Sequence, residues 1–341
     1  MTTTRRRFLQ NGFSAAAMTL PLFSVLSSRA HAAEFVLKLG NSYQAAHPTN
    51  LRIKEAGQKI KEESGGRIEL RLFADSQLGQ DTQMIEQMRS GALEMMATPL
   101  SYMSSLVPAV NVSGLGFAFS NYDQVWSAWD GNYGAFLRKQ CPDKIGVFCF
   151  DKTFDNGFRQ ITASTRPVNK PEDLNGMKIR VPAEENKTSL FKHLGAAPAT
   201  VSIKETYSAL QTHVVDAQEN GLPHIEFWKF YEVAKYCSLT NHIWDGLSVF
   251  INLATFERMP TTLQEIVARN LDAAALKQRA DMLALNQVLL GKIEKWGMKV
   301  NSTNPEEFRD ALRRSGYYQE WRAKLGEDAW QMLEVYTGAL G

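Results

Sequence analysis

The most informative chemical feature of the sequence is an arginine near the end of an apolar segment. Arg180 lies in residues 175–182, which read Asn-Gly-Met-Lys-Ile-Arg-Val-Pro. Apolar side chains occupy alternate positions, so Arg180 points to the opposite face near the carboxyl end of a predicted strand. Ligands of open α/β sheets bind beyond such ends, and a guanidinium can hold a carboxylate by two parallel hydrogen bonds. The segment therefore indicates a carboxylate-binding arginine, although a solvated strand arginine has the same pattern.

Two further polar residues, Arg159 and Asn220, have weaker patterns of the same kind. Arg159 follows Asn156-Gly157, a dipeptide typical of a turn, and we expect a crossover between two parts of the fold there. Asn220 follows a short predicted strand, and its amide can both donate and accept hydrogen bonds. An arginine paired with an acid and an ordinary turn asparagine are the alternatives.

Strand and helix patterns alternate along most of the chain. Alternating or continuous apolar runs predict strands at 36–39, 67–73, 93–98, 145–150, 158–163, 177–181, 214–218 and 247–253. Helical spacing predicts helices between them, one of them capped by Asp81. The alternation predicts an α/β fold with a largely parallel sheet. Residues 261–296 predict one helix, long enough to run along two lobes.

Residues 1–32 have the pattern of an export signal. The basic cluster Arg5-Arg6-Arg7 precedes an apolar run, and Ala30-His31-Ala32 has the form that signal peptidases cleave. The paired arginine before Phe-Leu predicts export by the twin-arginine (Tat) route. The apolar run is short and interrupted for a membrane-spanning helix. We therefore expect cleavage after Ala32 and a soluble periplasmic protein.

Charge and composition argue against several function classes. The 341-residue chain has a net charge of +2, and the signal holds four arginines and no acid, so the mature charge is −2. Such a balance, without a basic block, argues against nucleic-acid binding. The mature length exceeds one typical core and predicts two lobes. Cys141, Cys149 and Cys237 lack metal-binding spacing, so we expect buried thiols and no metal or cofactor, although a disulfide remains open.

The chain resembles the extracytoplasmic solute receptors of the tripartite ATP-independent periplasmic (TRAP) transporters, the DctP family. The specific segments are Gly-Met-Lys-Ile-Arg-Val-Pro at 176–182 and Gln-Glu-Asn at 218–220. Supporting segments lie at 76–79, 84–91, 157–160, 207–217, 230–233 and 240–242. The resemblance extends in order over nearly the whole mature chain.

The resemblance implies a two-lobed periplasmic binding protein fold with a hinge and a long helix that braces both lobes. The first lobe would comprise residues 33–156 and about 246–285, and the second 157–245 and about 286–341. The two lobes would close on the ligand as a hinged trap.

The resemblance also implies site residues. Arg180 corresponds to the signature arginine that pairs with the substrate carboxylate. Arg159 corresponds to a second, supporting cleft arginine, and Asn220 to an amide that contacts the same carboxylate. Ser42 and His47 lie where the first lobe supplies ligand contacts.

Four more positions bear on the ligand. Ile203 lies where a side chain, often larger, packs against the ligand. Thr98 and Pro99 lie near a polar or acidic cleft residue of some acid-sugar-binding relatives, and the proline argues against a polyhydroxylated acid such as sialic acid. Trp244 lies near a cleft segment, and an apolar or aromatic monocarboxylate is favoured if it faces the ligand. Phe117 lies nearby, with core packing as its expected role.

The expected function is capture of a small organic acid and its delivery to the small and large membrane subunits of a TRAP permease, by a monomer without catalytic activity. A Tat-exported periplasmic enzyme acting on a small organic acid is the main alternative, although motifs such as HExxH, GxSxG and the P-loop are absent from the sequence. A receptor that presents its ligand to a signalling partner is a second alternative.

Overall fold

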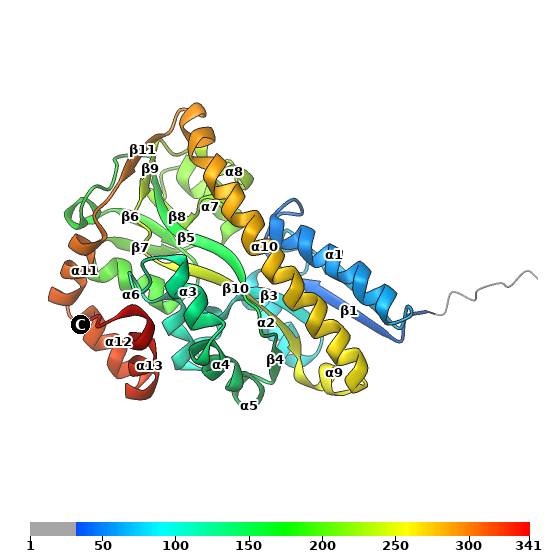
Figure 1. Ribbon diagram of the computed structural model, residues 1–341. Helices are drawn as coiled ribbons and strands as arrows, with labels where there is room; N and C mark the ends of the chain where they lie inside the picture. Colours follow the sequence, from blue (N-terminus) through cyan, green and yellow to red (C-terminus); the bar gives the residue numbers. More distant parts are fainter. Residues whose placement is uncertain (1–31) are drawn as a thin grey trace, which may run out of the picture. The chain divides into compact units, whose positions relative to one another are not determined.

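The computed structural model describes residues 32–341, drawn in colour in Figure 1. The predicted export signal lies outside the described residues, apart from Ala32. None of the helices in the described part combines the length and apolar character that crossing a bilayer requires.

Eleven strands of the described chain form one connected sheet. Its main path runs in the order β2 (Ile68–Phe73), β1 (Phe35–Gly40), β3 (Met95–Pro99), β10 (Trp244–Asn252), β5 (Phe154–Ala163), β8 (Ala217–Gly221), β6 (Lys178–Val181) and β7 (Ala197–Thr200). Off this path, β4 (Val147–Cys149) pairs with β10, and β9 (Tyr236–Leu239) pairs with β5 and with β11 (Lys299–Ser302).

The sheet is mixed, which corrects the expectation of a largely parallel one. Parallel pairs form at both ends of the path, where β1 pairs with β2 and β3, and β6 pairs with β7 and β8. The centre is antiparallel, because β10 pairs with β3 and β5, and β5 pairs with β8. Continuous burial is typical of parallel strands, but here the antiparallel central strands β5 and β10 are also buried along almost their whole length.

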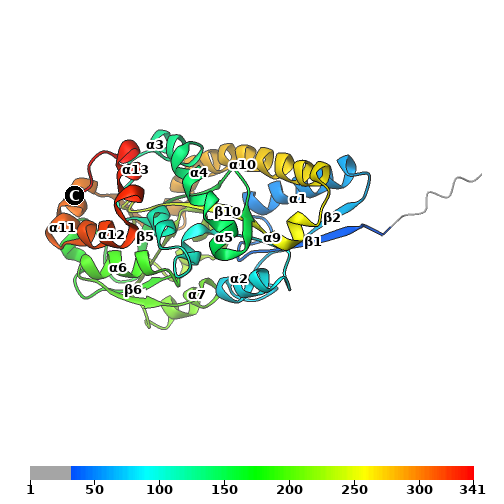
Figure 2. The ribbon, with the colours of Figure 1, turned by 90° about the horizontal axis from the view of Figure 1, so that it is seen from below.

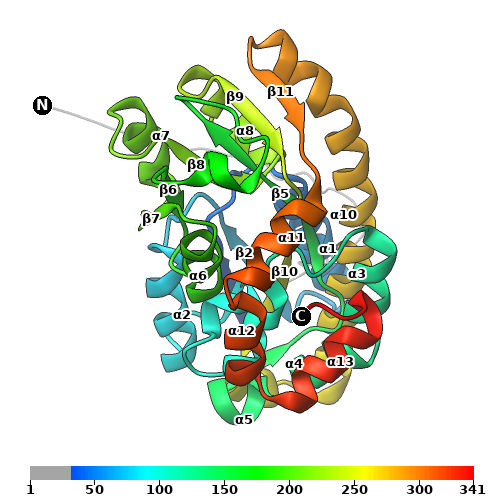
Figure 3. The same cartoon turned by 90° about the vertical axis from the view of Figure 1, so that its left-hand side faces the viewer.

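The helices lie mostly between successive strands. Their bounds are α1 Pro48–Glu63, α2 Asp81–Ser90, α3 Tyr122–Trp129, α4 Asn132–Lys139, α5 Cys141–Ile145, α6 Glu185–His193, α7 Ile203–Gln211, α8 Pro223–Phe227, α9 Leu253–Glu257, α10 Thr261–Lys295, α11 Pro305–Arg314, α12 Tyr317–Leu325 and α13 Glu327–Thr337, with short 3₁₀ turns at Leu100–Met103, Pro108–Gly114, Pro171–Leu174 and Phe230–Glu232. Figure 2 and Figure 3 show α13 packed beside α3.

The helix α10 confirms the predicted long helix and contributes to two hydrophobic cores. Its first half packs Leu263, Val267 and Leu271 into the core beneath α1 and β1. Near its end, Leu289 and Ile293 enter a different core, which holds the side chains around α7 and α8. Figure 1 shows the helix running past both α1 and α8. A helix shared by two cores couples them mechanically.

The segment before Arg159 differs from its prediction. Asn156 and Gly157 lie inside the continuous strand β5 and form no turn. Gly157 has a φ of 81°, and the register of β10 against β5 shifts opposite it, between Trp244 and Gly246. The Asn-Gly pair therefore marks an irregularity within a long strand, because glycine tolerates positive φ there as well as in turns.

Cys141, Cys149 and Cys237 are buried free thiols, as expected. The two-lobed fold with the long helix is confirmed by related structures, reported below. The residue boundaries of the two lobes stay a prediction.

Candidate functional site

Two adjoining cavities lie where β6, α2 and α7 meet. The inner one has a volume of about 30 Å³ and the outer one about 460 Å³. The residues common to both walls are Asp81, Tyr102, Arg180, Pro182 and Ile203. The inner wall is completed by Ser42, Tyr43, Pro99, Asn156, Arg159, Glu184, Asn220, His224 and Asp245. The shared walls make a polar inner chamber that continues into a wider groove.

Arg180 lies at the carboxyl end of β6, as the sequence predicts. Its side chain is 2% exposed, and its Nε donates a hydrogen bond of 2.7 Å to the Val201 carbonyl. Burial lowers the pKa of Arg180, because desolvation disfavours its charge. Within residues 32–341 it has no carboxylate partner in a salt bridge, so both Nη atoms remain available toward the cavity. This is the arrangement that a bound carboxylate would complete.

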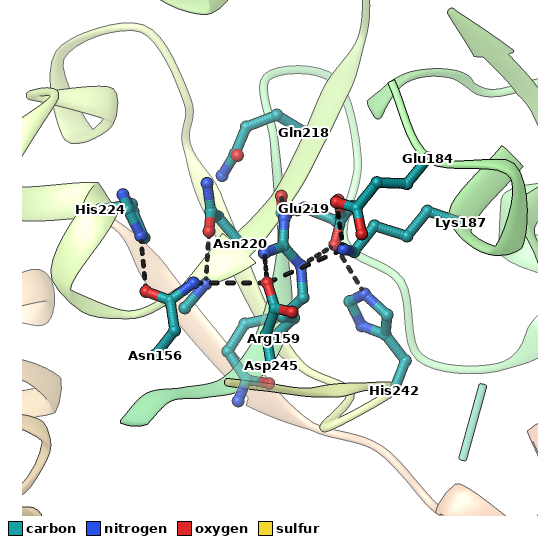
Figure 4. Close-up of polar contacts among 12 residues, drawn as sticks. Asn156, Arg159, Glu184, Lys187, Gln218, Glu219, Asn220, His224, His242 and Asp245 are labelled. Atoms are coloured by element: carbon teal, nitrogen blue, oxygen red, sulfur yellow. Dashed lines mark hydrogen bonds and ion pairs between the residues drawn. The ribbon is translucent and has the colours of Figure 1, made fainter. Parts of the chain in front are cut away.

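Arg159, on β5, differs from Arg180 because it is paired with carboxylates of the protein itself, as Figure 4 shows. Its Nε and Nη2 donate to the carboxylate of Glu219, and its Nη1 donates to Asp245 Oδ2 at 2.6 Å. Register explains the first contact, because β5 and β8 are antiparallel neighbours and Arg159 pairs with Gly221, two residues from Glu219. Burial opposes its charge, but Glu219 and Asp245 outweigh that and raise the pKa of Arg159.

Glu219 is the central carboxylate of this cluster. Burial favours its neutral form, yet Arg159 and His242 hold its pKa well below the usual range. His242 lies with Nε2 3.1 Å from Glu219 Oε2 and Nδ1 2.7 Å from Thr240 Oγ1. Burial lowers the pKa of His242, so the ring is neutral at pH 7.

A second ion pair completes the cluster. Lys187, on α6, is fully buried and donates to Glu184, which also accepts a hydrogen bond from Ser101. The Lys187 Nζ lies 3.7 Å from Asp245 Oδ2, so Asp245 joins this pair to Arg159. Figure 4 shows these side chains converging from β5, β8, β10 and the start of α6.

Asn220 and His224 are two uncharged polar residues that line the chamber. The Asn220 Oδ1 accepts from the Gly221 amide at 3.0 Å, which leaves its Nδ2 to face the cavity. The Nε2 of His224 lies 3.1 Å from Asn156 Oδ1, while its buried Nδ1 has no partner among the described residues. Burial lowers the pKa of His224 well below the usual value, so this ring is also neutral.

Asp81 is the half-buried acid of the outer wall. It is the first residue of α2, after the capping residue Gln80, which corrects the expectation that Asp81 itself caps the helix. The Ser42 Oγ donates to its Oδ1 at 3.1 Å, and no basic side chain of the described chain forms an ion pair with it. Burial, reinforced by the nearby Glu184, raises the pKa of Asp81 to about 6.

Five of the predicted ligand-binding residues line the cavities: Ser42, Arg159, Arg180, Ile203 and Asn220. Their role toward a ligand stays a prediction. The two arginines differ in their ability to bind a ligand carboxylate, because Arg159 is already paired with Glu219 and Asp245.

Three other predicted residues lie outside both cavity walls. His47 caps α1, accepting from the Thr49 amide at 3.2 Å, and stacks on His224. Trp244 packs on Trp126 and Trp129 with ring centroids 5.2 and 5.4 Å away.

Thr98 is fully buried in β3, while its neighbour Pro99 reaches the cavity. Successive residues of a strand face opposite sides, which separates the two. Phe117 stacks on Phe308 in the core, as expected.

Several cavity residues were absent from the prediction: Tyr43, Asp81, Tyr102, Glu184, His224 and Asp245. Glu184 follows Pro182 just past the end of β6, so the rule that located Arg180 also points to it. Asp245 is the residue after the predicted Trp244 on β10. Successive side chains of a strand point to opposite faces, so Asp245 faces the ion-pair cluster and Trp244 faces the core.

Comparisons with known proteins identify the family of this chain. Residues 39–323 match the family described as bacterial extracellular solute-binding protein, family 7, or DctP. The chain belongs to this family. Members of the family are extracytoplasmic solute-binding proteins that bind small organic acids.

Individual relatives extend the comparison. The sialic acid-binding periplasmic protein SiaP of Vibrio cholerae is 28% identical over 91% of this chain and 95% of its own length. A protein of Sinorhizobium fredii, y4mM, is 34% identical, and this chain spans 50% of its length. The TRAP periplasmic solute-binding protein of Sulfitobacter sp. NAS-14.1, crystallised with β-D-galacturonate, has a TM-score of 0.84 at 28% identity, covering 89% of this chain and all of that one.

Proposed function

We propose that this protein captures a small organic acid in the space formed by the inner chamber and the outer groove, and delivers it to a TRAP membrane permease. The observation that carries the proposal is Arg180, which is buried, lines a cavity, and has neither a carboxylate partner nor a hydrogen bond from its Nη atoms among residues 32–341. A guanidinium in that state is costly until a carboxylate pairs with it. Relatives that bind sialic acid and galacturonate support an acid as the ligand.

Four of the wall residues have proposed roles. Arg180 holds the ligand carboxylate by two parallel hydrogen bonds, and the Asn220 Nδ2 donates a third to the same group. Ile203 packs against the carbon skeleton. Arg159 contributes charge and at most one N–H, because its other donors are used by Glu219 and Asp245.

Ligand capture couples to closure of the two lobes. A carboxylate that touches Arg180 and residues of the opposite wall binds the closed state better than the open one, so it shifts the population toward closure. The strands β5 and β10 connect the proposed lobes and would act as the hinge, with α10 bracing both. The closed surface is then recognised by the membrane partner.

We also propose a cellular location and a membrane partner for this protein. The Tat-type signal at 1–32 supports export to the periplasm. We infer a monomer without catalytic activity that works with the small and large membrane subunits of the permease. The ion gradient across the membrane, and not a nucleotide, would drive transport in this assignment.

A thermal-shift screen of the purified protein against small organic acids tests the proposal. A ligand that binds the native state raises the melting temperature by mass action, by an amount that depends on its concentration relative to Kd. A shift from one class of acid that disappears in Arg180→Ala would support the assignment. Silence from every acid, with folded and ligand-free protein, would overturn it.

A further inference from the structure

Two charged side chains shared by both cavity walls have no ionic partner within the described chain, and the exposed Glu205 of the outer wall is also outside every ion pair there. Arg180 comes from the end of β6, and Asp81 comes from the start of α2. Both line the inner and the outer cavity, yet no ion pair joins them. The site thus presents a cation and an anion, separated from one another, to the same space.

The other charges around the inner cavity are already paired, and they leave an excess of carboxylates. Arg159 and Lys187 are the cations, and Glu184, Glu219 and Asp245 are the acids. With Arg180 and Asp81 included, three cations face four carboxylates, and burial keeps His224 and His242 neutral.

This charge balance discriminates between ligand classes. A ligand that brings only a carboxylate pairs with Arg180 but adds a negative charge to a cluster that already holds an excess. Because charges interact strongly where water is excluded, the added anion is unfavourable toward Asp81 and Glu184. A ligand that also carries a positive charge leaves the balance unchanged.

We infer that the ligand is a zwitterion, with its carboxylate at Arg180 and a protonated primary or secondary amine at Asp81. The inference rests on the proposed function and narrows its substrate class from organic acids to amino acids and related amino-carboxylates. The ammonium donates a charge-assisted hydrogen bond to the Asp81 carboxylate, whose Oδ1 already accepts from Ser42 and which forms no ion pair within residues 32–341.

The physical basis of selectivity is the difference between an ammonium and a hydroxyl at the same carbon. A hydroxyl and an ammonium can both donate a hydrogen bond to the Asp81 carboxylate, but only the ammonium also neutralises its charge. An unsubstituted acid leaves Asp81 with only its hydrogen bond from Ser42 and without a counter-charge, next to the ligand. We expect the order amino, hydroxy and unsubstituted, from tightest to weakest.

Calorimetric titration with matched sets of ligands tests the inference. Each set holds the amino, hydroxy and unsubstituted members of one carbon skeleton, for linear and cyclic acids of three to six carbons, with the corresponding dicarboxylates alongside. We expect at least one amino acid to bind about tenfold tighter than its hydroxy counterpart, which corresponds to about 1.4 kcal/mol. In Asp81→Asn this preference should fall to about twofold or less.

The matched control is Glu86→Gln, on the exposed side of the same helix, where Glu86 pairs only with Arg89. It should bind all ligands as the wild type does. Tighter binding of a hydroxy acid, unsubstituted acid or dicarboxylate, or an amino preference that survives Asp81→Asn, would overturn the inference while leaving the carboxylate-binding function standing. Failure of every carboxylate to bind would overturn the proposed function itself.

Discussion

Arg159 and Glu219 are joined by two side-chain hydrogen bonds, from Nε and Nη2, and Nη2 also donates to the Glu219 carbonyl at 2.8 Å. With Nη1 on Asp245, four of the five guanidinium N–H groups are used inside the protein. Arg180 uses one of its five N–H groups within the described chain, in the bond to the Val201 carbonyl. The two arginines therefore have different structural roles. Arg159 forms ion pairs within the cavity wall, whereas Arg180 lines the cavity without an ionic partner in the described chain.

Removing Arg159 should destabilise the fold. In Arg159→Met, Glu219 and Asp245 would remain buried without their main cation, so we expect the free energy of unfolding to fall by about 3–5 kcal/mol. Urea denaturation followed by circular dichroism measures this change.

The control is Arg71→Met, which breaks an exposed pair of 2.9 Å with Glu69 and should cost less than about 1 kcal/mol. Equal losses in the two variants would show that the buried ion pairs of Arg159 contribute no more to stability than an exposed pair does.

Removing Arg180 should abolish binding with little effect on stability. The side chain has one hydrogen bond to the protein, so Arg180→Ala should fold normally, but the ligand carboxylate would lose its partner in a buried site, at a cost of about 2–5 kcal/mol in binding. Arg180→Lys should also bind poorly, because a point charge cannot reproduce two parallel hydrogen bonds.

Calorimetry with the best acid from the screen measures both variants. Arg314→Ala, at an exposed position on α11, serves as the control and should bind as the wild type. Wild-type affinity in Arg180→Ala would exclude Arg180 as the anchor.

The sequence predicts the elements of this fold better than their connections. Alternating apolar residues locate β2 and β6, and helical spacing over thirty-five residues locates α10, because both patterns record which side chains are buried. Strand direction in the sheet, and the continuation of β5 through Gly157, depend on partners far along the chain. A local pattern contains no information about those partners.

The residues of the site also differ in how far the sequence predicts their positions and contacts. Arg180 is predictable because its strand pattern and the end of the strand are both local. The pairing of Arg159 is not, because Glu219 lies 60 residues away and Asp245 86 residues away. Trp244 shows the limit most clearly, since it neighbours Asp245 in sequence but packs into the core, with its Nε1 bonded to Asp155 at 2.9 Å.

Asp155 should make stability depend on pH. Burial raises its pKa to about 6, above the value of 3.8 in an unfolded chain. The native state therefore binds more protons between these values, so this residue's contribution to stability is lost as pH rises from about 4 to about 6. Asn at this position can accept the same two bonds, from Gly157 and Trp244, on a single oxygen.

We therefore expect Asp155→Asn to gain about 2–3 kcal/mol relative to the wild type between pH 4 and pH 7. Urea unfolding at several pH values measures this difference. Asp328→Asn, at an exposed position, should follow the wild-type pH profile. A constant difference between Asp155→Asn and the wild type would show that Asp155 titrates normally.

Two glycines should respond to alanine in opposite directions. Gly291 is exposed within α10, and a Cβ there would meet no atom within 4 Å, so Gly291→Ala should raise the free energy of unfolding by about 0.5–1 kcal/mol. At Gly221, beside the cavity, a Cβ would lie 2.4 Å from the Asn156 carbonyl oxygen. Gly221→Ala must displace β5 from β8, at a cost of about 1–3 kcal/mol.

Urea unfolding compares the two variants, and ligand titration separates their effects on the site. Displacement of Asn156 would disturb its contact with His224 on the cavity wall, so Gly221→Ala should also weaken binding, whereas Gly291→Ala should not. A stable Gly221→Ala variant with unchanged affinity would mean that the close approach of β5 and β8 is not required to shape the chamber.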